Sequence, residues 1–310
     1  MDCVILAGNR ESYRAFSEKP NKAFLEIQGR TILDLMLEQL VSVPAIDRLF
    51  LVGPKSQIEA HLAKLDLARL GKPIQVFEQS SDLVNNIEEV IQATQVDDHS
   101  DRYLLILPSD IPLLTHQELI QFIDQCNLDA YDMVSGVTTS KALSQFYPTS
   151  NLPGIRMAYF YFKEGAFRIN NMHMVRPGAL KYGHYIRKTY AMRYQKELIN
   201  ILKMIWGLLG VAWRNPDGIY IYLGMSMARL LRERGFFRMA HFFSRQFTLE
   251  RTSRSISKVL GTRFKIAITH YGGAAIDVDN ESDYQAVVAR YDEWKTLQKN
   301  NIETHSTNSG

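Results

Sequence analysis

The sequence predicts an α/β fold in which parallel strands alternate with crossover helices, with a helical insertion added to it. Three observations support this fold class. The chain has 310 residues, of which 46% are hydrophobic, which suits one large α/β domain or one domain with a large insertion. Apolar runs alternate with helical patterns from residue 1 to about 140. The segment 178–260 reads as further helices, rich in arginine and aromatic residues.

The first part of the chain supplies the predicted sheet and its crossover helices. Apolar runs predict strands at 4–7, 49–52, 74–77, 103–107 and 133–137. Helical patterns lie between or after these runs, at 31–42, 56–70, 83–95 and 115–127. Because each strand is followed by a helix, we expect the strands to be parallel.

The second part of the chain departs from this alternation. Residues 153–176 alternate apolar and polar residues around Lys163-Glu164-Gly165, which predicts a hairpin added to the sheet. The helical segment 178–260 precedes a strand at 264–268 and a last helix that ends near residue 299. Residues 300–310 are polar, and we expect them to be a disordered tail.

The helical segment is also a concentration of positive charge. Residues 181–260 contain 15 Lys and Arg but 4 Asp and Glu, whereas the net charge of the whole chain is +3. This segment contains two long apolar runs, and charged residues interrupt both of them, so neither run qualifies as a membrane-spanning helix. We favour a helical subdomain with solvated arginines. The alternative is an interfacial surface for an anionic membrane, and no nucleic-acid partner is expected.

Cysteine content bears on the compartment. The chain has two cysteines, too few for a disulfide framework or a cysteine metal site, which favours a reducing environment. The N-terminal region has neither a basic stretch nor a long apolar run, so we expect no signal peptide and a cytoplasmic protein.

Three polar clusters follow predicted strands, where ligand sites of open α/β sheets are built. Gly8-Asn9-Arg10, with Lys22 downstream, follows the first strand. Ser109-Asp110 follows the fourth strand, and Asp277-Val278-Asp279-Asn280 follows the last one. Carboxylates suit magnesium, and lysine or arginine neutralises phosphate. The loop after the first strand is therefore predicted to hold a nucleoside triphosphate.

The stretches VILAGN…KPNKAFLEIQGRTILDLMLEQL, LPSDIPLLT and AIDVDNESDYQAV resemble, in this order, the nucleotidyltransferases related to molybdenum cofactor guanylyltransferase. The resemblance covers about residues 1–177 and 262–290. It implies a three-layer α/β/α Rossmann-like fold with a mostly parallel mixed sheet, formed by residues 1–177 and 262–299. The residues 178–261 would be a basic helical insertion. It also implies transfer of a nucleoside monophosphate from a triphosphate to a phosphorylated acceptor, such as a sugar, polyol or other alcohol phosphate. Such transfer uses Mg²⁺ and releases pyrophosphate.

The resemblance assigns roles to individual residues. Lys22 matches the lysine that stabilises charge on the α-phosphate, and Asp110 and Asp279 match the two metal-binding aspartates. Asn171 matches the segment that lines the acceptor side. The nucleotide side is matched by Leu6, Ala7, Gly8, Asn9, Arg14, Lys22, Ser81 and Asn86.

Two departures from the family pattern stand in the first motif. Asn9 replaces the second glycine, and Arg14 matches the family's arginine only with one residue inserted. Two alternatives to the nucleotidyltransferase therefore stay open. One is a glycosyltransferase on the same fold, and the other is a non-catalytic module that binds nucleotides or docks on membranes.

Overall fold

The computed structural model describes residues 1–8, 21–66, 70–80, 83–93, 102–179 and 216–307. Strands are β1 (Asp2–Leu6), β2 (Glu26–Ile27), β3 (Arg30–Thr31), β4 (Arg48–Gly53), β5 (Ile74–Glu78), β6 (Leu104–Pro108), β7 (Met133–Thr139), β8 (Phe160–Phe162), β9 (Gly165–Val175) and β10 (Phe264–Thr269). Helices are α1 (Ile32–Val41), α2 (Lys55–Leu62), α4 (Leu83–Ala93), α5 (His116–Cys126), α6 (Ser140–Leu143), α9 (Pro216–Glu233), α10 (Phe237–Ser244), α11 (Leu249–Leu260) and α12 (Glu281–Thr307). Short 3-10 helices are η1 (Lys22–Phe24), η2 (Ser144–Phe146), η3 (Pro177–Ala179) and η4 (Gly273–Ala275).

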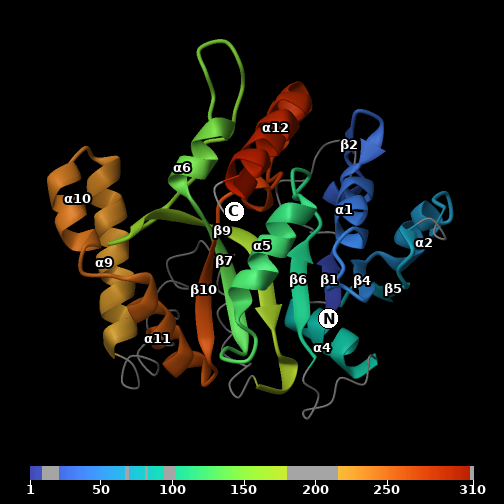
Figure 1. Ribbon diagram of the computed structural model, residues 1–310, viewed down its shortest axis with the longest axis horizontal. Coiled ribbons are helices and arrows are strands. Elements are labelled where there is room, and N and C mark those ends of the chain that lie inside the picture. The colour runs from blue at the N-terminus through green and yellow to red at the C-terminus, as the bar shows by residue number, and fades with distance from the viewer. Residues whose placement is uncertain (9–20, 67–69, 81–82, 94–101, 180–215, 308–310) are drawn as a thin grey trace.

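The main sheet has the order β10-β7-β9-β6-β1-β4-β5, with β8 paired to β9 (Figure 1). Neighbouring strands are parallel except around β9, which is antiparallel to β6, β7 and β8. The predicted parallel sheet and the added hairpin at Lys163-Glu164-Gly165 are thus both confirmed. The result is a mostly parallel mixed sheet in an α/β fold.

Side chains that alternate along the strands build a core on each face of the sheet. In β1, Cys3 and Ile5 face the core that is also formed by α1, α5 and α12, whereas Val4 faces the core against α4. At the other end of the sheet, the second face is covered by α9 and α11, whose Ile221 and Leu249 pack against Val137 of β7. Burial of apolar side chains on both faces makes the three-layer arrangement stable.

Local sequence signals account for the helix that follows the β2–β3 hairpin. Thr31 caps α1, because its hydroxyl accepts a hydrogen bond from Asp34 N and the Asp34 carboxylate accepts one from Thr31 N, each at 3.1 Å. The preceding turn places Gln28 and Gly29 at positive φ, 53° and 76°, as a two-residue hairpin loop requires.

Two helices end at places other than those expected from sequence. α2 ends at Leu62 because the chain tightens there, with Lys64 N donating to His61 O and Leu65 N to Leu62 O. α12 continues to Thr307, past residue 299 and into the predicted tail, over a stretch that contains neither proline nor glycine. None of the helices in the described ranges has the length and apolar character to span a bilayer.

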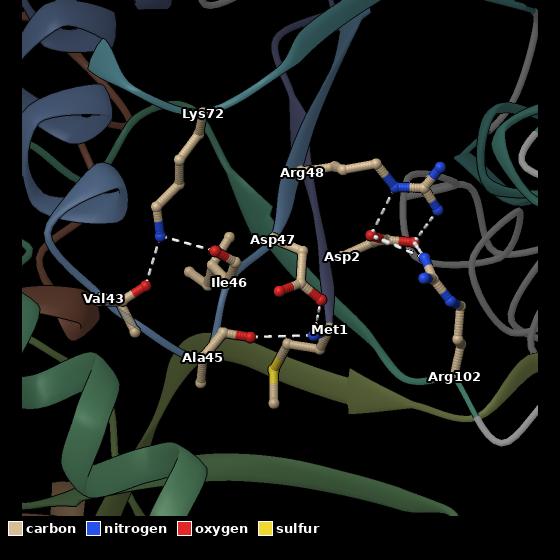
Figure 2. Close-up of polar contacts among 9 residues, drawn as sticks. All are labelled: Met1, Asp2, Val43, Ala45, Ile46, Asp47, Arg48, Lys72 and Arg102. Atoms are coloured by element: carbon tan, nitrogen blue, oxygen red, sulfur yellow. Dashed lines mark hydrogen bonds and ion pairs between the residues drawn. The ribbon is translucent and has the colours of Figure 1, made fainter. Parts of the chain in front are cut away.

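The amino ends of the central strands are fixed by buried charge (Figure 2). Asp2 is fully buried and accepts two hydrogen bonds from Arg48, at 2.9 and 2.6 Å, and two from Arg102, at 3.2 and 3.5 Å. Lys72 Nζ donates to the carbonyls of Val43 and Ile46 beside this group. These contacts stabilise the amino ends of the strands. The predicted ligand residues lie at the opposite, carboxyl ends.

Candidate active site at the carboxyl ends of the strands

A lysine lies between two carboxylates at the carboxyl ends of the strands. Lys22 Nζ is 3.0 Å from Asp110 Oδ2 and 3.1 Å from Asp279 Oδ1, and 24%, 18% and 45% of the three side chains are exposed. The aspartates are 88 and 257 positions from Lys22 in sequence. The fold therefore brings together the three residues that the motifs single out.

Lys22 is positioned by the residue before it. The Asn21 side chain accepts a hydrogen bond from Ala23 N at 2.9 Å and so caps η1, the short helix that begins at Lys22. The same side chain donates to Ala7 O at 2.8 Å and is buried. Asn21 therefore fastens the lysine to the end of β1.

Asp110 lies in the loop after β6. Ser109 N donates to Leu6 O at 3.1 Å, which extends the β1–β6 pairing to the start of this loop. Asp110 O accepts from Val278 N at 2.9 Å, so the backbones of the two acidic motifs are joined directly. Buried Ile111 anchors the loop from the other side.

The loop that leads to Asp277 and Asp279 is held by a buried glutamate on α5. Glu118 accepts hydrogen bonds from Thr269 Oγ1 at 3.2 Å, Gly272 N at 3.1 Å and Ala274 N at 2.9 Å. Burial raises the pKa of Glu118 even though these donors act against it. The Glu118 carboxylate thus provides hydrogen-bond acceptors for the backbone amides of Gly272 and Ala274.

Close packing also fixes this loop. A Cβ at Gly273 would lie 1.9 Å from Leu113 O, so no side chain fits there without displacement of the backbone. From β9, Arg168 pairs with Asp277 at 2.6 Å and donates to Ala275 O at 3.1 Å. Asn171, at φ 63°, donates to Ala274 O at 3.1 Å. The second acidic motif is therefore held by both α5 and β9.

The charges of the cluster affect one another. Burial alone would lower the pKa of Lys22, but Asp110 and Asp279 outweigh it and leave that pKa raised. For Asp279 burial acts upward, and Lys22 outweighs it so that the pKa is lowered. Burial raises the pKa of Asp277 to about 6, with the other two carboxylates adding to the effect and Arg168 opposing it. At neutral pH the site therefore holds a charged Lys22 facing an ionised Asp279.

The predicted nucleotide side begins where β1 ends. Ala7 N donates to Val52 O at 2.7 Å, so this amide, like the strand residue Leu6 before it, belongs to the sheet. Gly8 is exposed, and a Cβ there would lie 2.9 Å from Gln79 Oε1. Leu6 and Ala7 therefore form the end of the strand and Gly8 begins the loop after it, and the nucleotide-binding role of all three residues stays a prediction.

The structure also describes one of the two residues predicted at the helix beside the nucleoside. Asn86 of α4 accepts a hydrogen bond from Ser80 N at 2.5 Å, which ties the helix to the loop after β5. This loop includes Gln79, the neighbour of Gly8. The other predicted residues of the nucleotide side, Asn9, Arg14 and Ser81, lie outside the described residues.

Three positioning residues were missed by sequence reasoning: Asn21, Glu118 and Arg168. Asn21 carried a signal, because asparagine directly before the motif lysine is a preferred helix cap. Glu118 and Arg168 carried none, since each occupies an ordinary polar position of an amphipathic helix or strand. Glu118 contacts Thr269, which is 151 positions away in the sequence, and Arg168 contacts Asp277, which is 109 positions away.

The residues present fit a divalent cation. Oxygens of Asp110 and Asp279 converge on one positive group, the Lys22 ammonium, from within 3.1 Å, and carboxylates are the protein ligands that Mg²⁺ prefers. In the described part of the chain, no three His, Cys, Asp or Glu side chains are arranged to hold a metal by themselves. Mg²⁺ is commonly held by one or two carboxylates together with substrate phosphates, and Asp110 and Asp279 would supply such a pair.

Comparison with known proteins found similar solved structures and one matching family model. A hypothetical transferase from Thermus thermophilus has 19% identity and a TM-score of 0.63, with 91% of this chain and 98% of that chain covered. A 4-diphosphocytidyl-2C-methyl-D-erythritol synthase from Anaerococcus prevotii DSM 20548 has 15% identity and a TM-score of 0.48, with 94% and 95% covered. Among curated proteins no sequence matches this chain. The sequence model of the MobA-like NTP transferase domain matches residues 3–176, more than half of the chain, and it includes Lys22 and Asp110. The chain belongs to the family of MobA-like NTP transferase domains.

Proposed function

We propose that the protein transfers a nucleoside monophosphate from a nucleoside triphosphate to a phosphorylated small molecule, with Mg²⁺ and with release of pyrophosphate. One observation carries the proposal: Lys22 Nζ lies within 3.1 Å of both Asp110 and Asp279 at the carboxyl ends of the strands. Separate loops would have no structural reason to gather these charges, because a loop carboxylate contributes little to a core.

The reaction needs positioning and neutralisation of charge more than proton transfer. An oxygen of the acceptor phosphate attacks the α-phosphorus and forms the new P–O bond. The bond from the α-phosphorus to the bridging oxygen breaks, and its electron pair leaves with pyrophosphate. Lys22 is the group assigned to the α-phosphate, since an ammonium held in a partly buried site stabilises charge that develops in the transition state.

Asp110 and Asp279 would hold the divalent cation, which supplies neutralisation of the triphosphate charge when bound. Glu118 and Arg168 keep the loop of Asp279 in place through Gly272, Ala274 and Ala275. Fixed carboxylates avoid the cost of reorganising the site during the reaction.

We assign the acceptor side to Asn171 and the neighbouring part of β9. Asn171 is half-buried and donates a hydrogen bond to Ala274 O, in the loop that leads to Asp277 and Asp279. An acceptor bound near Asn171 would therefore be close to these carboxylates. Arg168 of the same strand adds positive charge beside Asp277, as a phosphorylated acceptor requires.

A pyrophosphate-release screen tests the proposal. The four common triphosphates are each combined with a panel of sugar, polyol and alcohol phosphates, with Mg²⁺ and then with EDTA in its place. We expect pyrophosphate to appear with at least one pair and to require Mg²⁺. Binding of a triphosphate without release for any acceptor would favour the non-catalytic module.

A further inference from the structure

A cationic hairpin stands at the β10 end of the molecule. Helices α9 and α10 pack against each other, and Figure 1 shows them beyond β10, at the side opposite α2. The turn between them lies toward the same end of the molecule as α6 and α12. Only one side of α9 is used for burial, through Ile221 and Ala228. On α10, Ala240 and Ser244 are also buried, and the other residues of the hairpin are partly or largely exposed.

The outward side of this hairpin is unusually apolar. Among the residues that the structure describes, the large hydrophobic side chains that are more than half exposed all lie on it, with exposed fractions of 53–65%. They are Tyr222, Leu223, Phe236, Phe237, Met239 and Phe242, which we call the hairpin apolar surface. Soluble monomers seldom leave such side chains together in water, and where they do, a partner usually covers them.

Arginines accompany this surface, whereas acidic groups on it are neutralised. Arg229, Arg232, Arg234, Arg238 and Arg245 are all exposed. The hairpin's two acidic residues, Asp217 and Glu233, are paired with Arg251 and Arg229. Arg232 lies over the rings of Tyr161 and Phe237, at 4.8 and 5.7 Å, so its cation shares space with apolar groups. The surface therefore offers apolar side chains within a field of positive charge.

We propose that the hairpin apolar surface docks the protein on an anionic phospholipid bilayer as a peripheral contact. Exposed Phe and Leu would enter the boundary between headgroups and acyl chains, and the arginines would meet lipid phosphates at the same depth. A second copy of the chain is a poorer occupant, because a self-paired surface would bring two sets of arginines together without acidic partners. This inference stands apart from the proposed reaction, since binding to vesicles requires neither nucleotide nor acceptor.

The test is co-sedimentation of the full chain with vesicles at low salt. Vesicles of phosphatidylglycerol and phosphatidylcholine in equal amounts are compared with vesicles of phosphatidylcholine alone. We expect at least about tenfold stronger binding to the anionic vesicles and release toward about 1 M salt, where the screening length falls to about 3 Å.

Matched variants separate the surface from general effects. The combined change Leu223→Ser, Phe237→Ser and Phe242→Ser should weaken vesicle binding by about tenfold or more. The control Ile120→Ser, Leu152→Ser and Val288→Ser alters side chains that are 37–44% exposed elsewhere, and it should leave binding unchanged. Because all six positions are surface positions, the variants should remain folded, which thermal unfolding checks.

Charge is tested in the same way. Arg234→Glu with Arg238→Glu should reduce binding at low salt by about tenfold or more. Lys64→Glu with Lys299→Glu makes the same change in net charge at exposed positions off the hairpin and should have little effect.

Three results would overturn the proposal. The first is an absence of binding to anionic vesicles by the wild-type chain at low salt. The second is equal weakening by the hairpin and control variants. The third is a wild-type dimer in solution that the serine variant converts to monomer, which would identify a second copy of the chain as the occupant.

Discussion

Replacement of Lys22 by methionine removes the ammonium between Asp110 and Asp279 and keeps most of the unbranched side chain. If Lys22 stabilises charge on the α-phosphate, turnover at saturating substrate should fall by about 100- to 1,000-fold, since a donor aimed at developing charge contributes roughly 3–4 kcal/mol. The same change should strengthen binding of a divalent cation, because the ammonium occupies the point on which the two carboxylates converge.

The contacts in the structure set the size of this second effect. Lys22 makes two contacts, at 3.0 and 3.1 Å, with side chains that are 18% and 45% exposed. Partly exposed ion pairs of this kind contribute up to about 1 kcal/mol each. A cation that binds between the carboxylates must therefore break two ion pairs, at a cost of about 1–2 kcal/mol. Without the lysine, affinity should rise by about five- to thirtyfold.

Two measurements test the Lys22→Met prediction. Pyrophosphate release at saturating substrates gives turnover, and titration with Mn²⁺ in the absence of nucleotide gives cation affinity. Lys55→Met is the control, because Lys55 is 48% exposed and lies 3.8 Å from Glu59 on α2. Unchanged turnover with a raised KM for triphosphate would make Lys22 a binding group. If Lys22→Met binds Mn²⁺ no more tightly than the wild-type chain does, the hypothesis that Asp110 and Asp279 together hold a cation is wrong.

Three further predictions follow, two from contacts of the site and one from an ion pair at the amino ends of β7 and β10. Asp110→Ala should abolish pyrophosphate release while leaving the thermal unfolding midpoint nearly unchanged, and wild-type turnover would refute its role. Glu118→Gln turns one acceptor oxygen into a donor facing the loop amides, so it should lower the free energy of unfolding in urea by about 1–3 kcal/mol and reduce turnover. An unchanged urea midpoint would contradict this. Asp132 has a pKa of about 2, against an ordinary 3.8, chiefly because Arg263 donates to it. The stability from this carboxylate is present above pH 4 and is lost as the pH falls toward 2. Asp132→Asn should therefore cost at most about 2.5 kcal/mol at pH 7, with the urea midpoints of the two proteins converging near pH 2.

Much of the sheet formed by residues 1–177 could be predicted, because the sequence signals for its strands and turns are local. The run VILA predicts a buried strand, and Lys163-Glu164-Gly165 predicts a hairpin, without reference to the rest of the chain. Asp110 comes two residues after the end of a strand, so its place at the carboxyl ends of the strands also follows from the α/β alternation.

The supports of the site could not be predicted because their partners are remote. Glu118 has the helix position of any polar residue, and only the fold shows that it meets the amides of Gly272 and Ala274. Arg168 likewise gains a role only when β9 lies beside the loop of Asp277. The cationic excess of residues 181–260 was visible in sequence, whereas the division of α9 into buried and exposed faces depends on how this helix packs.

The order in which the site is completed has a consequence for synthesis of the protein. Lys22 and Asp110 emerge early, but Asp279 follows β10, which completes the sheet only after residues 178–260 have been made. A nascent chain that has not reached residue 264 therefore has the lysine and one carboxylate but not the second, and its β7 edge is still unpaired by β10. Such an edge invites wrong pairing until β10 arrives. On the proposed function, ribosome-bound chains should acquire nucleotide-dependent protection from proteolysis late in translation, after residue 279 has emerged.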